Sequence, residues 1–152
     1  MCIRELETLV KAGMEVFDVG TGSGILSIAA AKLGAGKITA VDYDRTALKV
    51  ARENIGQDHV GEVIPLGQSD ILEQGDGKAD LVIANIIADI IIRLFDELEA
   101  HLNPGGALLA SGIIADRIGD VTEAALAHGF TIEKVIETGG WAAMVIHAGG
   151  RK

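Results

Sequence analysis

The sequence of 152 residues is poor in cysteine, aromatic residues and positive charge. Its single cysteine, Cys2, excludes an internal disulfide and is compatible with a reducing compartment. Aromatic residues make up only 3% of the chain, so aliphatic side chains must fill the core. The net charge of −9 argues against non-specific nucleic-acid binding, because such binding depends on Lys and Arg neutralising phosphates.

Long hydrophobic runs are also missing. The most apolar region, residues 81–95, is interrupted by Asn85 and two charged residues and is too short to span a bilayer. Charged residues interrupt the first ten positions, where a signal peptide would be apolar. These absences predict a cytoplasmic protein with no membrane partner.

Strand-like and helix-like segments alternate along most of the chain, and we expect residues 1–152 to form one domain. We predict strands at Glu15–Val19, Lys37–Val41, Glu62–Leu66, Ala79–Ala84 and Ala107–Ser111. We predict helices at Ile3–Lys11, Ser23–Leu33, Arg45–Ile55, Ala88–Leu102 and Ala115–Ala127. Apolar strands alternating with helices indicate an α/β fold with a parallel sheet and helices on both faces.

The pattern changes at the end of the chain. Phe130–Glu137 and Trp141–His147 both read as strands, and only three residues separate them. So short a connection predicts a hairpin. We therefore expect one antiparallel strand in an otherwise parallel sheet.

The stretch "VFDVGTGSGILSIAAAKLG", residues 16–34, carries glycines at alternate positions between the first strand and its helix (Gly20, Gly22 and Gly24). In a doubly wound sheet, ligands bind beyond the carboxyl ends of the strands. A backbone without Cβ atoms lets a ligand approach closely, and the helix that follows offers unpaired N–H groups. The stretch therefore predicts a ligand cradle.

Two acidic residues narrow the choice of ligand. Dinucleotide-binding loops read Gly-x-Gly-x-x-Gly, but Ile25 stands where the third glycine belongs. Asp18 would repel a pyrophosphate and suits a ligand with an ammonium or sulfonium group. Asp42 follows Gly20 by 22 positions, the spacing at which an acid reaches ribose hydroxyls, and Asp44 is the better helix cap. A ribose-bearing cofactor is predicted, and both nicotinamide and sulfonium cofactors remain open.

Four segments resemble the class I S-adenosylmethionine-dependent methyltransferases: "DVGTGSG" (Asp18–Gly24), "VDYD" (Val41–Asp44), "SDIL" (Ser69–Leu72) and "ANIIAD" (Ala84–Asp89). The succession "GTGSGILSIAAAKLGA", "NIIAD", "PGGALLASGI" and "GGWAAMVI" is similar, more narrowly, to the catalytic domain of the PrmA family. That family methylates amino groups of the eleventh protein of the large ribosomal subunit. The resemblance runs from Ile3 to His147, and "NIIAD" with "SGI" is its more specific part.

The resemblance implies a Rossmann-like doubly wound sheet of seven strands, six parallel and one antiparallel. It also implies roles for the motif positions. The methionine end of S-adenosylmethionine, and of its product S-adenosylhomocysteine, would be held by the first motif (Asp18, Gly20, Thr21, Gly22 and Gly24). Asp42 would bind both ribose hydroxyls, and Asp70 and Ile71 would lie against the adenine. Asn85 matches the position where amino-methylating relatives place an Asn or Asp beside the cofactor and the reacting amine.

The chemistry supports Asn85 as the catalytic candidate. Methyl transfer from a sulfonium is an in-line displacement that needs neither a covalent enzyme intermediate nor a metal, so alignment of the reactants can supply much of the catalysis. The attacking amine must be neutral, although a free lysine has a pKa of about 10.4. A dry pocket with Asn85 accepting a hydrogen bond from the amine N–H would favour that form. The alternative is that Asn85 caps the next helix, for which Asp89 is a further candidate.

The sequence gives less support for a metal site, a catalytic thiol or a hydrolase serine. The four histidines are scattered without the spacing of a metal site (His59, His101, His128 and His147). Cys2 has no histidine close by, and Ser23 lacks the Gly-x-Ser-x-Gly setting of a hydrolase. We interpret Trp141 as hairpin packing.

From the resemblance we expect no counterpart here of the N-terminal recognition domain and the linker that PrmA-like enzymes carry, and a natural stand-alone relative, a fragment and a shortened reading frame all remain open. The leading hypothesis is an N-methyltransferase acting on an amine of a protein, with a ribosomal protein as the candidate substrate. A nicotinamide-dependent oxidoreductase and a non-catalytic binding module are the alternatives. The opening left by an absent domain could be covered by a partner chain, which would make an oligomer.

Overall fold

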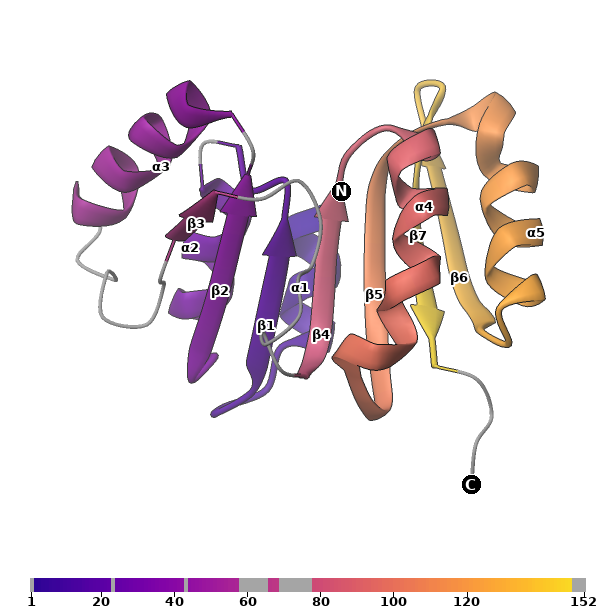
Figure 1. Cartoon of the computed structure of the whole chain (residues 1–152), viewed down its shortest axis with the longest axis horizontal. Helices are drawn as coiled ribbons and strands as arrows, with labels where there is room; N and C mark the ends of the chain where they lie inside the picture. Colours follow the sequence, from indigo (N-terminus) through magenta and orange to yellow (C-terminus); the bar gives the residue numbers. More distant parts are fainter. Residues whose placement is uncertain (1, 23, 43, 58–65, 69–77, 149–152) are drawn as a thin grey trace.

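A computed structural model describes residues 2–22, 24–42, 44–57, 66–68 and 78–148. Its strands form one seven-stranded sheet in the order β3-β2-β1-β4-β5-β7-β6 (Figure 1). They are β1 (Glu15–Val19), β2 (Lys37–Asp42), β3 (Leu66–Gln68), β4 (Ala79–Asn85), β5 (Leu102–Ile114), β6 (Thr131–Thr138) and β7 (Trp141–His147). All neighbouring pairs are parallel except those of β7, which runs antiparallel to both β5 and β6. The predicted mixed sheet with its C-terminal hairpin is confirmed.

Helices cover both faces of this sheet. They are α1 (Cys2–Leu9), α2 (Ile25–Lys32), α3 (Arg45–Gln57), α4 (Ala88–Leu98) and α5 (Ile118–Ala127), with short 3₁₀ turns η1 (Glu99–His101) and η2 (Ala115–Arg117). One core cluster joins α1, α2 and α3 to the sheet through residues such as Leu6, Ile28 and Ile55. The other joins α4 and α5 to the opposite face through Ile91 and Val121. Figure 1 accordingly draws α4 and α5 in front of the strands and α1 and α2 behind them.

The apolar stripe predicted on α4 packs as expected. Ile91, Leu94, Phe95 and Leu98 are all buried against the sheet. The helix, however, ends at Leu98 and not at Leu102, because Leu102 pairs with Ala79 as the first residue of β5. Pro104 also disfavours helical backbone in the residue before it. The predicted strand Ala107–Ser111 is therefore only the middle of β5.

Other boundaries also differ from prediction. The helix after the glycines begins at Ile25, because Gly24 has a left-handed backbone with φ 87° that no helical residue adopts. The segment 115–127 begins as a 3₁₀ turn before α5. β3 shares only Leu66 with the predicted strand Glu62–Leu66, and residues 62–65 lie outside the described residues.

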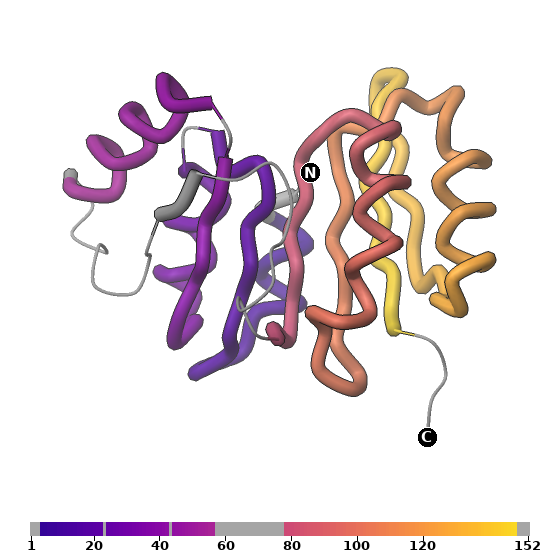
Figure 2. Tube along the Cα trace, viewed as in Figure 1, coloured from indigo at the N-terminus to yellow at the C-terminus, as the bar shows by residue number. Residues whose placement is uncertain are grey.

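The order of the strands fixes where a ligand can bind. From β1 the chain moves outward to β2 and β3, and β4 then lies on the other side of β1. Figure 2 shows β1 between β2 and β4. The direction of winding therefore reverses between β1 and β4. Such a switch point opens a crevice beyond the carboxyl ends of the two strands. The loop after β1 contains four of the predicted site residues (Gly20, Thr21, Gly22 and Gly24), while Asp18, Asp42 and Asn85 lie at or near the carboxyl ends of β1, β2 and β4.

Candidate functional site

The loops that follow β1 and β4 touch each other at Gly20 and Ile86. Gly20 has φ +73°, and a Cβ atom built there would lie only 2.4 Å from the Ile86 Cγ2 atom. The backbone N–H groups of Gly20 and Thr21 both donate to the Val41 carbonyl at 2.9 Å, which anchors the loop to β2. Glycine is required at position 20 because no side chain fits between the loops.

Asp18 is the buried acid of the site, with 1% of its surface exposed. Its Oδ2 atom accepts hydrogen bonds from the Thr21 hydroxyl at 2.8 Å and from the Ser27 hydroxyl at 2.7 Å. Ser27, on the first turn of α2, is fully buried and was missed by the sequence analysis. The sequence signal for Ser27 was a polar residue within an alanine-rich helix, nine positions after Asp18. The two hydroxyl groups, of Thr21 and Ser27, hold the Asp18 side chain in place.

Only one of the two carboxyl oxygens of Asp18 has a hydrogen-bond donor among the described residues. Burial raises the pKa of this carboxyl above its ordinary value of 3.8, the bonds from Ser27 and Thr21 lower it, and the charge of Asp42 raises it again. The Asp18 Oδ1 atom is buried and has no hydrogen-bond donor among the described residues. An unpaired carboxylate oxygen fits a positively charged ligand and opposes a pyrophosphate.

Asp42 lies at the end of β2 and joins two backbone segments. Its Oδ2 atom accepts a hydrogen bond from the Gly22 N–H at 2.9 Å, and its Oδ1 atom accepts one from the Asp44 N–H at 2.9 Å. Each carboxylate oxygen keeps a lone pair for a ligand hydroxyl. Asp44 instead accepts from the Thr46 N–H at 2.9 Å and caps α3, as predicted. Asp42 is therefore not needed as the cap.

Asn85 is exposed at the carboxyl end of β4, opposite Ser111 of β5. The N-cap of α4 is Ile87, and no side chain caps this helix. The alternative in which Asn85 or Asp89 caps α4 is therefore wrong, because the helix begins beyond Asn85 and Asp89 already lies within its first turn. Asn85 is left beside the crevice without a capping role.

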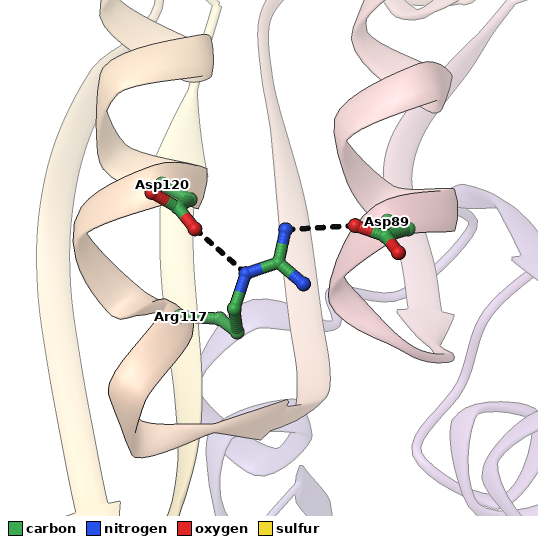
Figure 3. A network of polar contacts seen from close by, with 3 residues as sticks. All are labelled: Asp89, Arg117 and Asp120. Carbon is green, nitrogen blue, oxygen red and sulfur yellow. Dashed lines mark hydrogen bonds and ion pairs between the residues drawn. The ribbon is translucent and has the colours of Figure 1, made fainter.

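Asp89, in the first turn of α4, forms an ion-pair network with Arg117 and Asp120 (Figure 3). The Arg117 Nη2 atom donates to Asp89 at 2.7 Å, and the Arg117 Nε atom donates to Asp120 at 2.7 Å. The guanidinium thus ties the start of α4 to the start of α5. α4 follows β4, which ends with Asn85, and α5 follows β5, which pairs with it at Ser111, so the network links the two helices next to this strand pair.

Some predicted residues are not placed in the site. Asp70 and Ile71 lie outside the described residues, as do His59 and Ser23. Among the described residues, no group of three or more His, Cys, Asp or Glu side chains could hold a metal ion. Trp141, the first residue of β7, pairs with Thr138 across the hairpin and is half exposed. There it lines a groove of about 790 Å³ between α1 and the hairpin (Arg4, Glu5, Lys134, Ile136, Thr138 and Trp141).

In the ranges that the structure covers, no helix is long and apolar enough to cross a membrane.

Crystal structures of methyltransferases share this fold. A ribosomal protein L11 methylase from Lactobacillus delbrueckii subsp. bulgaricus superposes with a TM-score of 0.86 at 35% identity, covering 97% of this chain and 79% of that one. A SAM-dependent methyltransferase from Aquifex aeolicus superposes with a TM-score of 0.78, covering 96% of this chain and 86% of that one. Because its sequence identity is only 19%, the similarity to the Aquifex aeolicus structure shows a shared fold and nothing more.

Sequence comparison is more specific. The ribosomal protein L11 methyltransferase of Heliobacterium modesticaldum is 49% identical over 150 residues, which are 99% of this chain and 48% of that protein. The enzyme of the same name from an Exiguobacterium species is 42% identical over 149 residues, 98% of this chain and 48% of that protein. The chain spans about half the length of these curated relatives. The sequence model described as "Ribosomal protein L11 methyltransferase (PrmA)" matches residues 1–148, and the chain therefore belongs to this family.

Proposed function

We propose that this chain is an S-adenosylmethionine-dependent N-methyltransferase whose acceptor is an amino group of ribosomal protein L11. The observation that carries the proposal is that two acids are hydrogen-bonded to the same glycine loop. Asp18 accepts from Thr21 and keeps one buried oxygen with no hydrogen-bond donor among the described residues, and Asp42 accepts from the Gly22 N–H. Relatives at 49% and 42% identity are named for methylation of this ribosomal protein.

The residues of the crevice fit the two ends of the cofactor. Asp18 and the backbone from Gly20 to Gly24 would hold the methionine end, whose ammonium group complements the carboxylate. Asp42 would accept hydrogen bonds from the ribose hydroxyls while its bond to Gly22 fixes its position. The resemblance assigns Asp70 and Ile71 to the adenine. Residues 1–152 would act as one cofactor-binding domain, because the strands share a single sheet.

Bound S-adenosylmethionine supplies an electrophilic methyl group. The protein must then present a neutral amine in line with that group and keep water away. Asn85 is exposed at the crevice and comes directly before Ile86, whose side chain approaches Gly20. Its carbonyl oxygen would accept a hydrogen bond from the amine N–H and leave the nitrogen lone pair directed at the methyl group. The C–N bond would form as the C–S bond of the cofactor breaks, and the methylated ammonium would then release its extra proton to solvent.

The nicotinamide alternative is disfavoured on two grounds. Asp18 places negative charge where a pyrophosphate would lie, and Ile25 replaces the third glycine of the dinucleotide pattern. In the second alternative, the chain keeps the fold as a non-catalytic binding or scaffold unit. Only an assay of methyl transfer distinguishes such a module from an enzyme.

The test is transfer of a labelled methyl group from S-adenosylmethionine to purified ribosomal protein L11. We expect label on an amino group of the acceptor with the wild-type chain. Asn85→Ala should reduce turnover more than it weakens S-adenosylhomocysteine binding. Equal loss of both would make Asn85 a structural residue. Cofactor binding without any transfer would favour the binding module.

A further inference from the structure

Gly112 is an irregular position in β5, next to the residue that pairs with Asn85. The Cα partners along β4 and β5 end with Asn85 and Ser111, and Gly112 follows at once. Its φ of +78° lies in the left-handed region. The pairing of β5 with β7 also shifts register between Ala110 and Ile113, which places Gly112 within a bulge. Bulges of this kind often change the direction of a side chain near an active site.

The space above Gly112 is taken by Asn85. A Cβ atom built on Gly112 would lie 2.9 Å from the Asn85 Oδ1 atom, 3.2 Å from the Ile86 carbonyl oxygen and 3.4 Å from the Ile86 nitrogen. The Ile86 backbone is held in place, because its N–H donates to the Ser111 carbonyl at 3.2 Å. The Asn85 side chain is the group with most freedom to move away. A side chain at position 112 would therefore displace the Asn85 amide first.

We propose that Gly112 is a positioning residue for Asn85, because its missing Cβ leaves the space in which the Asn85 amide lies. The catalytic role of Asn85 rests on the proposed function, whereas the contact between Gly112 and Asn85 does not. Gly112 touches neither cofactor nor acceptor in this account. It acts by keeping the Asn85 oxygen where it can accept a hydrogen bond from the amine.

The chain offers a matched control in the same strand. Gly105 also belongs to β5 and has φ +80°, but nothing lies within 4 Å of a Cβ atom built there. Gly105→Ala thus introduces the same backbone strain without crowding. Any effect seen in Gly112→Ala and not in Gly105→Ala comes from the contact with Asn85 and Ile86.

The first measurement is the side-chain amide signal of Asn85 in a ¹H–¹⁵N spectrum, identified by its loss in Asn85→Ala. We expect this signal to shift in Gly112→Ala and to stay in place in Gly105→Ala. The second measurement is methyl transfer to ribosomal protein L11. Because small displacements of reacting groups are costly, kcat should fall about tenfold to a hundredfold in Gly112→Ala relative to Gly105→Ala, with the KM for S-adenosylmethionine unchanged.

The double variant Asn85→Ala/Gly112→Ala separates positioning from general damage. If Gly112 acts through Asn85, adding Gly112→Ala to Asn85→Ala lowers kcat no further. If Gly112→Ala alone fails to fold, recovery of folding in the double variant supports the contact, and failure of both while Gly105→Ala folds overturns the proposal. An unshifted Asn85 signal overturns it too. A shifted signal in a chain without any methyl transfer keeps the positioning role and contradicts the proposed function.

Discussion

The backbone N–H of Gly22 donates a hydrogen bond of 2.9 Å to the Asp42 carboxylate, which joins the loop after β1 to the end of β2. The same carboxylate accepts from the Asp44 N–H at the entrance to α3. Asp42 is thus fixed by backbone groups before any ligand arrives. A side chain held in this way loses little conformational entropy when a ligand binds, which favours affinity.

Replacing Asp42 by alanine should weaken binding of S-adenosylhomocysteine by about 1.5–3 kcal/mol, the range for lost hydrogen bonds to a charged group. Titration calorimetry measures the change. Asp44→Ala is the matched control, because it removes the cap of α3 and should lower the free energy of unfolding by about 0.5–2 kcal/mol while leaving affinity unchanged. Unchanged affinity in Asp42→Ala would remove Asp42 from the site.

The buried carboxyl of Asp18 should make stability and binding depend on pH in opposite directions. Since its folded-state pKa lies above the ordinary value of 3.8, the folded chain binds this proton more tightly than the unfolded chain. Between the two pKa values, the contribution of Asp18 to the free energy of unfolding of the ligand-free chain therefore falls as pH rises. Urea unfolding of wild type and Asp18→Asn across this range isolates that contribution as a difference.

Binding of an ammonium-bearing ligand should favour the ionised form of Asp18. Affinity for S-adenosylhomocysteine is then expected to increase as pH rises through the raised pKa, with release of a proton on binding. Calorimetry in two buffers of different ionisation enthalpy detects the proton. The same pH profile in Asp18→Asn would show that another group is responsible.

The sequence predicted the parts of the site that depend on local pattern. Alternate glycines after an apolar strand indicated the loop, and the spacing from Gly20 indicated Asp42. The bond from Ser27 to Asp18 was not predicted, because it depends on how α2 packs against β1. The contact of Gly112 with Asn85 was missed for a similar reason, since it requires the register of β4 against β5. The boundary at Leu102 was wrong because pairing with Ala79 overrides the helical spacing.

The Arg117 network should add a salt-dependent contribution to stability. Arg117→Gln removes the bond to Asp89 that ties α5 to α4 and the bond to Asp120 within the start of α5, so we expect a lower melting temperature at low ionic strength. The difference from wild type should shrink at high salt, because exposed charges are screened. Arg93→Gln, at an exposed arginine of α4, controls for the loss of one positive charge. Equal effects of the two substitutions would mean that the network contributes nothing specific.

His128 should stabilise the fold more when it is protonated than when it is neutral. A hydrogen bond with the Ala124 carbonyl and one with Asp96 raise the pKa of this imidazole above 6.5, with a smaller contribution from the charge of Glu99. Its contribution is therefore complete below pH 6.5 and is lost as pH rises through the folded-state pKa. His128→Gln should lower the urea midpoint at acidic pH more than in alkaline buffer. An equal loss of stability at acidic and alkaline pH would mean that His128 acts through the stacking of its ring on Phe95.

We expect a ligand with a positively charged methionine end and a ribose to bind beyond the carboxyl ends of β1 and β4. The decisive experiment is titration calorimetry of the wild-type chain with S-adenosylhomocysteine and, separately, with NADH. We expect saturable binding of S-adenosylhomocysteine that is weakened in Asp42→Ala, and no binding of NADH. Binding of NADH alone, or S-adenosylhomocysteine binding that ignores Asp42, would contradict it.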